Sequence, residues 1–220
     1  MYAKIKKEVY KEFINANKTT AGFSDCGIIS VRDSEKNVFA FLSMTNAADK
    51  YSEEDVIVVD AEGKIVSGNE SNFDERFEMH KMLYATNQNI NSIVQADLRW
   101  SCIWASSGLT LPPISTLHAQ NFKGEIYCTS AIDFNKGDSL YQKVGEAILN
   151  KFKYRGLKEQ GAVFVRNFGA VVWGETLSAT VKKACVLEEL CFRTVQVRAI
   201  NDEQYCYMPY ELAEELYSEN

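Results

Sequence analysis

The feature that most constrains the fold of this chain is a series of short apolar segments joined by tight polar turns. Residues 27–31 and 38–42 are rich in strand-forming side chains and flank the polar turn 33–37, which predicts a hairpin. Residues 56–60 and 64–68 are joined by the turn Ala61-Glu62-Gly63-Lys64 and predict a second hairpin. Further strands are expected at 92–97, 162–166 and 170–173. Hairpins join antiparallel strands, so one antiparallel or mixed sheet is expected.

Amphipathic helices are inserted between these strands. In the first of them, Ile5, Val9 and Phe13 recur at the spacing of one helix face. Helices are expected over 3–16, 74–86, 99–107, 138–153, 177–196 and 210–217. The sequence shows no Pro- or Ser-rich linker, so residues 1–220 are expected to form a single domain of α/β architecture.

The charge balance argues against two classes of partner. The net charge is −6, so neither nucleic acid nor an anionic membrane surface is expected as the main partner. No apolar run approaches the roughly 20 residues that a membrane-spanning helix needs. No glycine-rich nucleotide-binding spacing occurs.

The cysteines and the N-terminus both favour a cytoplasmic protein. Six cysteines in 220 residues, none with CxxC spacing, are too sparse for a disulfide scaffold and are expected to be reduced thiols. The first residues, MYAKIKKEVYKEF, lack the apolar segment of a signal peptide.

Several local strings resemble the class II aldolase/adducin family, whose members include fuculose-phosphate aldolase, ribulose-phosphate 4-epimerase and the adducin head domain. The matching strings are GIISVRD at 27–33, EEDVIVVDAEGKIVSG at 53–68, HKMLYATNQNINSIV at 80–94, the stretch 103–129 and the stretch 161–190. They keep their order over about residues 5–200, and 80–129 is most similar to the epimerase branch. The resemblance implies a three-layer α/β/α fold with a mainly antiparallel central sheet, and a homotetramer with active sites between subunits.

The resemblance also implies a zinc site, and this chain departs from it. Working family members bind zinc through a His-x-His pair and a third histidine in an RNHG-type loop. Here these positions hold Gln95, Asp97 and Phe168. A phenyl ring donates no lone pair, and amide and carboxylate oxygens suit Mg²⁺ or Ca²⁺ better than Zn²⁺. We therefore expect neither a bound zinc nor any other cofactor.

The catalytic positions implied by the resemblance are changed as well. The family's acid/base carboxylate falls on Arg76, with Glu75 adjacent to it, and the catalytic aspartate of the epimerase branch falls on Gln120. An amide does not transfer protons as a carboxylate does. In the family, a tyrosine near the C-terminus often reaches the active site of the neighbouring subunit. The tyrosines near that end of this chain are Tyr205, Tyr207, Tyr210 and Tyr217.

Some polar groups for a small sugar-phosphate-like ligand remain. The phosphate-loop asparagine of the family has become Ile28. Candidate binding residues are Ser30, Ser43, Asn46, Arg99 and His118. For His118 the alternative is a loop histidine without a site role, and for His80 it is a core histidine on a helix.

The replaced residues lead to one main functional hypothesis and two alternatives. The main hypothesis is a family member without zinc-dependent aldolase or epimerase activity that acts as a binding or assembly scaffold. The first alternative is a sugar-phosphate aldolase or epimerase with a rebuilt active site. The second is a subunit that completes the site of a histidine-bearing homologue.

Overall fold

The computed structural model describes residues 2–18, 27–44, 50–154, 156–157, 160–201 and 207–219. Its strands are β1 (Gly27–Asp33), β2 (Val38–Met44), β3 (Ile57–Asp60), β4 (Ile65–Ser67), β5 (Ser92–Ala96), β6 (Ala162–Val165) and β7 (Gly169–Gly174). Its helices are α1 (Ala3–Asn17), α2 (Phe77–Thr86), α3 (Arg99–Ser107), α4 (Thr116–Asn121), α5 (Leu140–Phe152), α6 (Leu177–Ile200) and α7 (Tyr210–Ser218), with 3₁₀ turns at Glu53–Asp55 and Glu70–Asn72.

The strands form one sheet in the order β4-β3-β2-β1-β5-β7-β6, and each neighbouring pair is antiparallel. Both predicted hairpins are present, as β1–β2 and β3–β4. In the first turn, Asn37 adopts a positive φ of 52°, a conformation that asparagine tolerates well. The expected antiparallel central sheet is thus confirmed.

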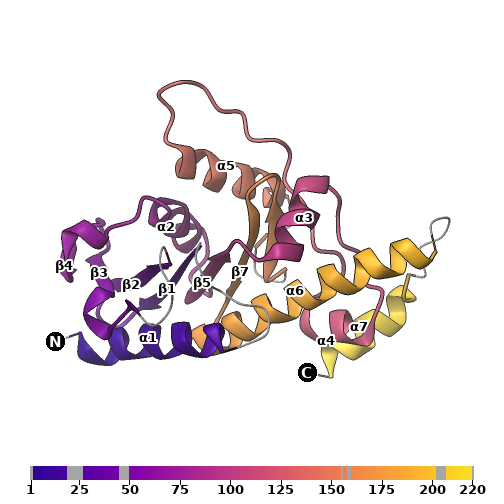
Figure 1. Cartoon of the computed structure of the whole chain (residues 1–220), viewed down its shortest axis with the longest axis horizontal. Coiled ribbons are helices and arrows are strands. Elements are labelled where there is room, and N and C mark those ends of the chain that lie inside the picture. The colour runs from indigo at the N-terminus through magenta and orange to yellow at the C-terminus, as the bar shows by residue number, and fades with distance from the viewer. Residues whose placement is uncertain are drawn as a thin grey trace.

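Helices cover both faces of the sheet (Figure 1). Alternate strand residues such as Ile29, Val94 and Val172 pack with α1, α3 and α6 on one face. Their neighbours, such as Ile28, Ile93 and Val171, pack with α2 and α5 on the other. This alternation follows from the two-residue period of a strand and produces three layers with two separate cores.

Two predicted boundaries beside the candidate site and one local segment differ from the expectation. Helix α2 begins at Phe77 rather than at 74, because the Asp74 side chain accepts the Arg76 N–H at 2.8 Å and holds a turn there. Strand β5 ends at Ala96, so Asp97 lies just beyond it. His118, for which a loop position was the alternative, lies instead on α4, whose N-cap Ser115 accepts the His118 N–H at 3.3 Å. Among the described residues, no helix is long and apolar enough to cross a membrane.

Candidate functional site

The candidate site lies at one end of the sheet, on the face covered by α2 and α5. Ser43, Ile28, Gln95 and Val171 are cross-strand neighbours on β2, β1, β5 and β7. Directly paired residues of adjacent strands point to the same face, so their side chains form a row across four strands. The turn before α2 lies over the Ser43 end of this row.

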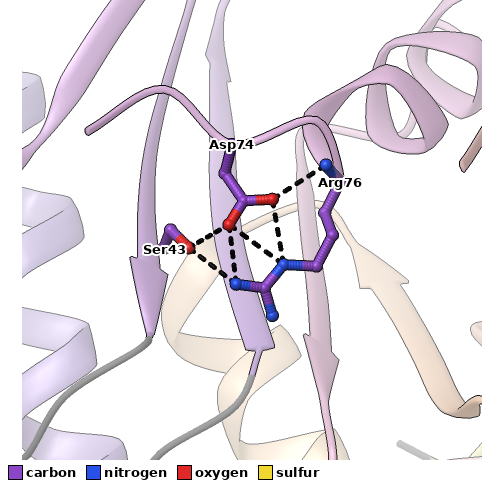
Figure 2. A network of polar contacts seen from close by, with 3 residues as sticks. All are labelled: Ser43, Asp74 and Arg76. Carbon is purple, nitrogen blue, oxygen red and sulfur yellow. Dashed lines mark hydrogen bonds and ion pairs between the residues drawn. The ribbon is translucent and has the colours of Figure 1, made fainter. Parts of the chain in front are cut away.

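A polar network joins that turn to the row (Figure 2). The Arg76 guanidinium contacts Asp74 through Nε, 3.0 Å from Oδ1, and through Nη2, 2.7 Å from Oδ2. Nη2 also donates to the Ser43 hydroxyl at 2.7 Å, and that hydroxyl donates to Asp74. Burial raises the pKa of the Asp74 carboxyl, but the hydrogen bonds from Arg76 and Ser43 outweigh it and the net shift is downward. Asp74 is therefore ionised at neutral pH, and these three groups satisfy one another.

The positive charge of Arg76 also affects the pKa of two further groups, Asp97 and Tyr141. Burial raises the pKa of the Asp97 carboxyl, and the nearby Arg76 offsets this only in part, although the residue as a whole is exposed. Burial likewise raises the pKa of Tyr141 at the start of α5, with Arg76 opposing and Asp74 and Asp97 adding to the rise. Asp74, Arg76, Asp97 and Tyr141 thus form one electrostatic cluster.

The three positions expected from the family's zinc site converge beside this cluster. Gln95 is only 7% exposed, and its Oε1 is buried without a hydrogen-bond partner among the described residues. A Cβ added to Gly169 would lie 3.6 Å from Asp97 Oδ1, so the β6–β7 turn that carries Phe168 approaches Asp97. Phe168 itself packs against the core on the α2 and α5 side.

This donor set does not fit zinc. Structural and catalytic zinc sites take three or four ligands, mostly imidazole or thiolate. Gln95 and Asp97 supply only oxygen atoms, and Phe168 supplies no lone pair. The Arg76 cation beside Asp97 also opposes a second positive charge there.

Other candidate residues are engaged elsewhere in the fold. Ser30 is fully buried, with its hydroxyl 2.7 Å from His80 Nδ1 and 2.8 Å from the Tyr84 hydroxyl. Burial lowers the pKa of His80 to about 3, so its imidazole is neutral, and its Nε2 has no hydrogen-bond partner among the described residues. His80 therefore lies in the core of the α2 layer.

His118 and Gln120 lie on α4, which packs against α6 and α7 rather than against α2. His118 is fully buried, and its Nε2 is 2.7 Å from the Gly124 carbonyl. Gln120 is exposed. Within one chain the fold does not bring these two residues to the cluster around Arg76.

Of the remaining candidate residues, two are exposed in the structure and two lie outside the described residues. Glu75 is exposed beside Arg76, and its negative charge contributes to the raised pKa of Tyr141. Arg99 is exposed at the first residue of α3, two positions after Asp97. Asn46 and Tyr205 lie outside the described residues.

Sequence reasoning missed two members of the cluster. Asp74 carries a recognisable signal, because an aspartate a few residues before a helix start commonly forms a turn with the backbone two residues on. Tyr141 carries no such signal, because it lies on the same face of α5 as Val144 and Ile148 and packs against the same core, so its spacing predicts only core packing.

The comparisons with known proteins agree with this fold. Residues 8–195 match the family described as Class II Aldolase and Adducin N-terminal domain. An L-fuculose 1-phosphate aldolase superposes with a TM-score of 0.80 at 20% identity, covering 98% of this chain and 95% of that one. YgbL from Escherichia coli, a putative aldolase/epimerase/decarboxylase, gives a TM-score of 0.76 at 16% identity, with 97% and 98% covered. A sugar-phosphate aldolase from Thermotoga maritima gives 0.63 at 16%, with 92% and 97% covered. The chain therefore belongs to the class II aldolase and adducin N-terminal domain family.

Proposed function

We propose that this chain has lost the zinc-dependent aldolase or epimerase chemistry of its family and acts as a binding or assembly scaffold. The observation that carries the proposal is the engagement of Arg76. It stands where the family has its acid/base carboxylate, and it is held by Asp74 and Ser43. A permanently protonated guanidinium cannot take a proton from a substrate.

The metal positions support the same conclusion. Because none of the three positions carries an imidazole, the chain lacks the ligands for the zinc ion that would act as a Lewis acid and polarise a carbonyl oxygen. Gln95, Asp97 and Phe168 cannot replace it together, because their donor atoms are too few and too hard for zinc.

The assembly part of the proposal is a cytoplasmic homotetramer, as the family resemblance implies. Exposed apolar side chains on α3 and α6 support self-association. Ile103 is 49% exposed and Phe192 37%, and the Phe192 ring lies 5.0 Å from that of Trp100. Apolar groups that gather on a surface are typical of contact sites.

The second candidate function is an aldolase or epimerase with a rebuilt site. One observation favours it: the Asp97 carboxyl has a raised pKa and lies near the Arg76 cation. A carboxylate made more basic by its surroundings can accept a proton, and a nearby guanidinium can stabilise an anionic ligand.

Metal content and turnover of one preparation decide between these functions. The protein is purified in metal-free buffers, its divalent metals and solution mass are measured, and sugar-phosphate cleavage and epimerisation are assayed. We expect a tetramer without stoichiometric zinc and without turnover. Turnover that is abolished by Asp97→Asn but not by chelators would establish the second candidate. Stoichiometric metal with chelator-sensitive turnover would overturn the scaffold function and would mean that the metal site has been rebuilt from other ligands.

A further inference from the structure

A cavity lies at the other end of β5 and β7 from the candidate site. Asp97 follows the last residue of β5, whereas Ser92, its first residue, pairs with Gly174 at the end of β7. Gly174 lines a cavity of about 280 Å³. The loop after α2, the start of α6 and α7 complete its walls, through residues that include Asn87, Thr180, Lys183 and Tyr217.

Lys183 is the distinctive group in this cavity. Its Nζ lies 5.9 Å from the centre of the Phe122 ring, and a Cβ added to Gly161 would lie 3.3 Å from it. The side chain is partly buried, yet Nζ makes no hydrogen bond or ion pair with the described residues. The Phe122 ring attracts the ammonium, but the partial burial of the side chain removes hydration from it, and this loss opposes the charged form.

We propose that Lys183 is a site of Nζ acylation by small acyl phosphates that enter this cavity. The neutral amine attacks the carbonyl carbon of the acyl phosphate. The new N–C bond forms as the C–O bond to phosphorus breaks, inorganic phosphate leaves with the electron pair, and the nitrogen loses its proton to water. The product is an uncharged amide.

Two properties of the site favour this reaction. Burial lowers the pKa of Lys183, while the charge of Glu175 opposes the shift, so the neutral nucleophile is enriched. Acylation then removes a charge whose burial is costly. Asn87 and Tyr217, which also line the cavity, carry side-chain donors that can hydrogen-bond the departing phosphate, and Glu175 is the carboxylate in the same wall.

Lys182 provides a matched control, because it is the adjacent, exposed lysine on the same helix. The folded protein is incubated with acetyl phosphate at pH 8, and the acetylation of each lysine is followed by fragmentation mass spectrometry. We expect Lys183 to react about threefold faster than Lys182 or more, because each unit by which an amine pKa falls raises its neutral fraction about tenfold.

Unfolding separates the effect of the fold from that of local sequence. In concentrated urea the two lysines should react at equal rates. Equal or slower acetylation of Lys183 in the folded protein would overturn the proposal, as would an excess that persists in urea. The result does not depend on the proposed function, because the cavity lies apart from the cluster around Arg76.

Discussion

Arg76 and Asp74 form a two-point ion pair in which Nε and Nη2 face the two carboxylate oxygens at 3.0 and 2.7 Å. Their side chains are only 12% and 16% exposed, so this pair is shielded from water far more than an ordinary surface pair. Asp74→Asn would leave the guanidinium uncompensated. We expect a loss of about 2 kcal/mol in the free energy of unfolding, measured by urea denaturation.

A surface pair serves as the control for this prediction. Lys143 and Glu146 lie 3.0 Å apart, with side chains 32% and 51% exposed. Glu146→Gln should change the free energy of unfolding by less than about 0.5 kcal/mol. Equal effects of the two substitutions would show that the Arg76 pair contributes no more than a solvated one.

The two buried histidines should make the protein less stable in mild acid. Burial lowers the pKa of His80 to about 3 and that of His118 to about 4. The unfolded chain binds protons at both imidazoles below about pH 6.5, while the folded chain does not, so stability falls as the pH falls through 6.5 toward these values. Between pH 7.5 and 5.0 each histidine should cost about 2 kcal/mol.

Urea denaturation at these two pH values measures the effect. The chain has only two histidines, so His80→Gln and His118→Gln together isolate the imidazole contribution from that of the carboxyls. Each substitution should remove about half of the imidazole contribution, whatever it does to stability at pH 7.5. A wild-type free energy of unfolding that stays constant over this interval would mean that the imidazoles are protonated in the folded state.

Glu188 on α6 should be important for the start of α3. Its carboxylate accepts the backbone N–H groups of Trp100 and Ser101 at 2.7 and 2.9 Å, and the residue is only 6% exposed. Backbone N–H groups in the first turn of a helix have no acceptor within the helix itself, so the Glu188 carboxylate supplies one. The helix dipole also favours a negative charge at this end. Glu188→Ala should lower the free energy of unfolding by about 2 kcal/mol or more.

The adjacent Glu189 is the matched control for Glu188. It is exposed and pairs with Arg193 one turn further along the same helix. Glu189→Ala should cost less than about 0.5 kcal/mol in the same urea denaturation experiment. If both substitutions cost the same, the helix start does not depend on the Glu188 carboxylate.

Gly169, in the turn that carries Phe168, should resist substitution. Its φ is +103°, and an added Cβ would lie 3.1 Å from Cys102 Sγ. Gly137 has a similar φ of +101° but open space around the added atom. Gly169→Ala should therefore destabilise by about 1 kcal/mol more than Gly137→Ala, because only the first adds a steric clash to the backbone strain. Equal melting temperatures of the two variants would contradict this.

The sheet was predictable from the sequence because its strands are short, strongly apolar and joined by turns with a clear chemical signature. The hairpin of β3 and β4, for example, follows from two β-rich segments around Gly63. The start of α2 was not predictable from periodicity, because the Asp74 side chain accepts a hydrogen bond from the Arg76 N–H, holds a turn there, and delays the helix start by three residues.

The candidate site was predictable only in part, for a different physical reason. Family positions identified Arg76 and Asp97 one by one, but neither spacing nor hydrophobic pattern reports that Asp74 and Tyr141 share their electrostatic environment. Such a cluster joins residues from separate elements and appears only after the chain has folded. His118 shows the converse, since its sequence position does not reveal that α4 packs away from α2.

Restoring histidines should restore metal binding if the scaffold has kept its geometry. Gln95 pairs with Val171, and Asp97 approaches Gly169, which follows Phe168, so the three former ligand positions lie near one another at the end of β5. The triple variant Gln95→His, Asp97→His, Phe168→His should bind about one zinc per chain, as judged by competition with a chromophoric chelator. The double variant that retains Phe168 should bind at least about tenfold more weakly, because it has lost one imidazole ligand.

The Arg76 charge should weaken zinc binding by this triple variant. Neutralising the ion pair with Arg76→Gln and Asp74→Asn together removes the repulsion without leaving a buried charge unpaired. Zinc affinity should then rise by about tenfold, which corresponds to about 1.4 kcal/mol. If the triple variant binds no zinc while it remains folded, the ligand positions have moved apart as well as changed. The loss of chemistry would then lie in the scaffold and not only in its side chains.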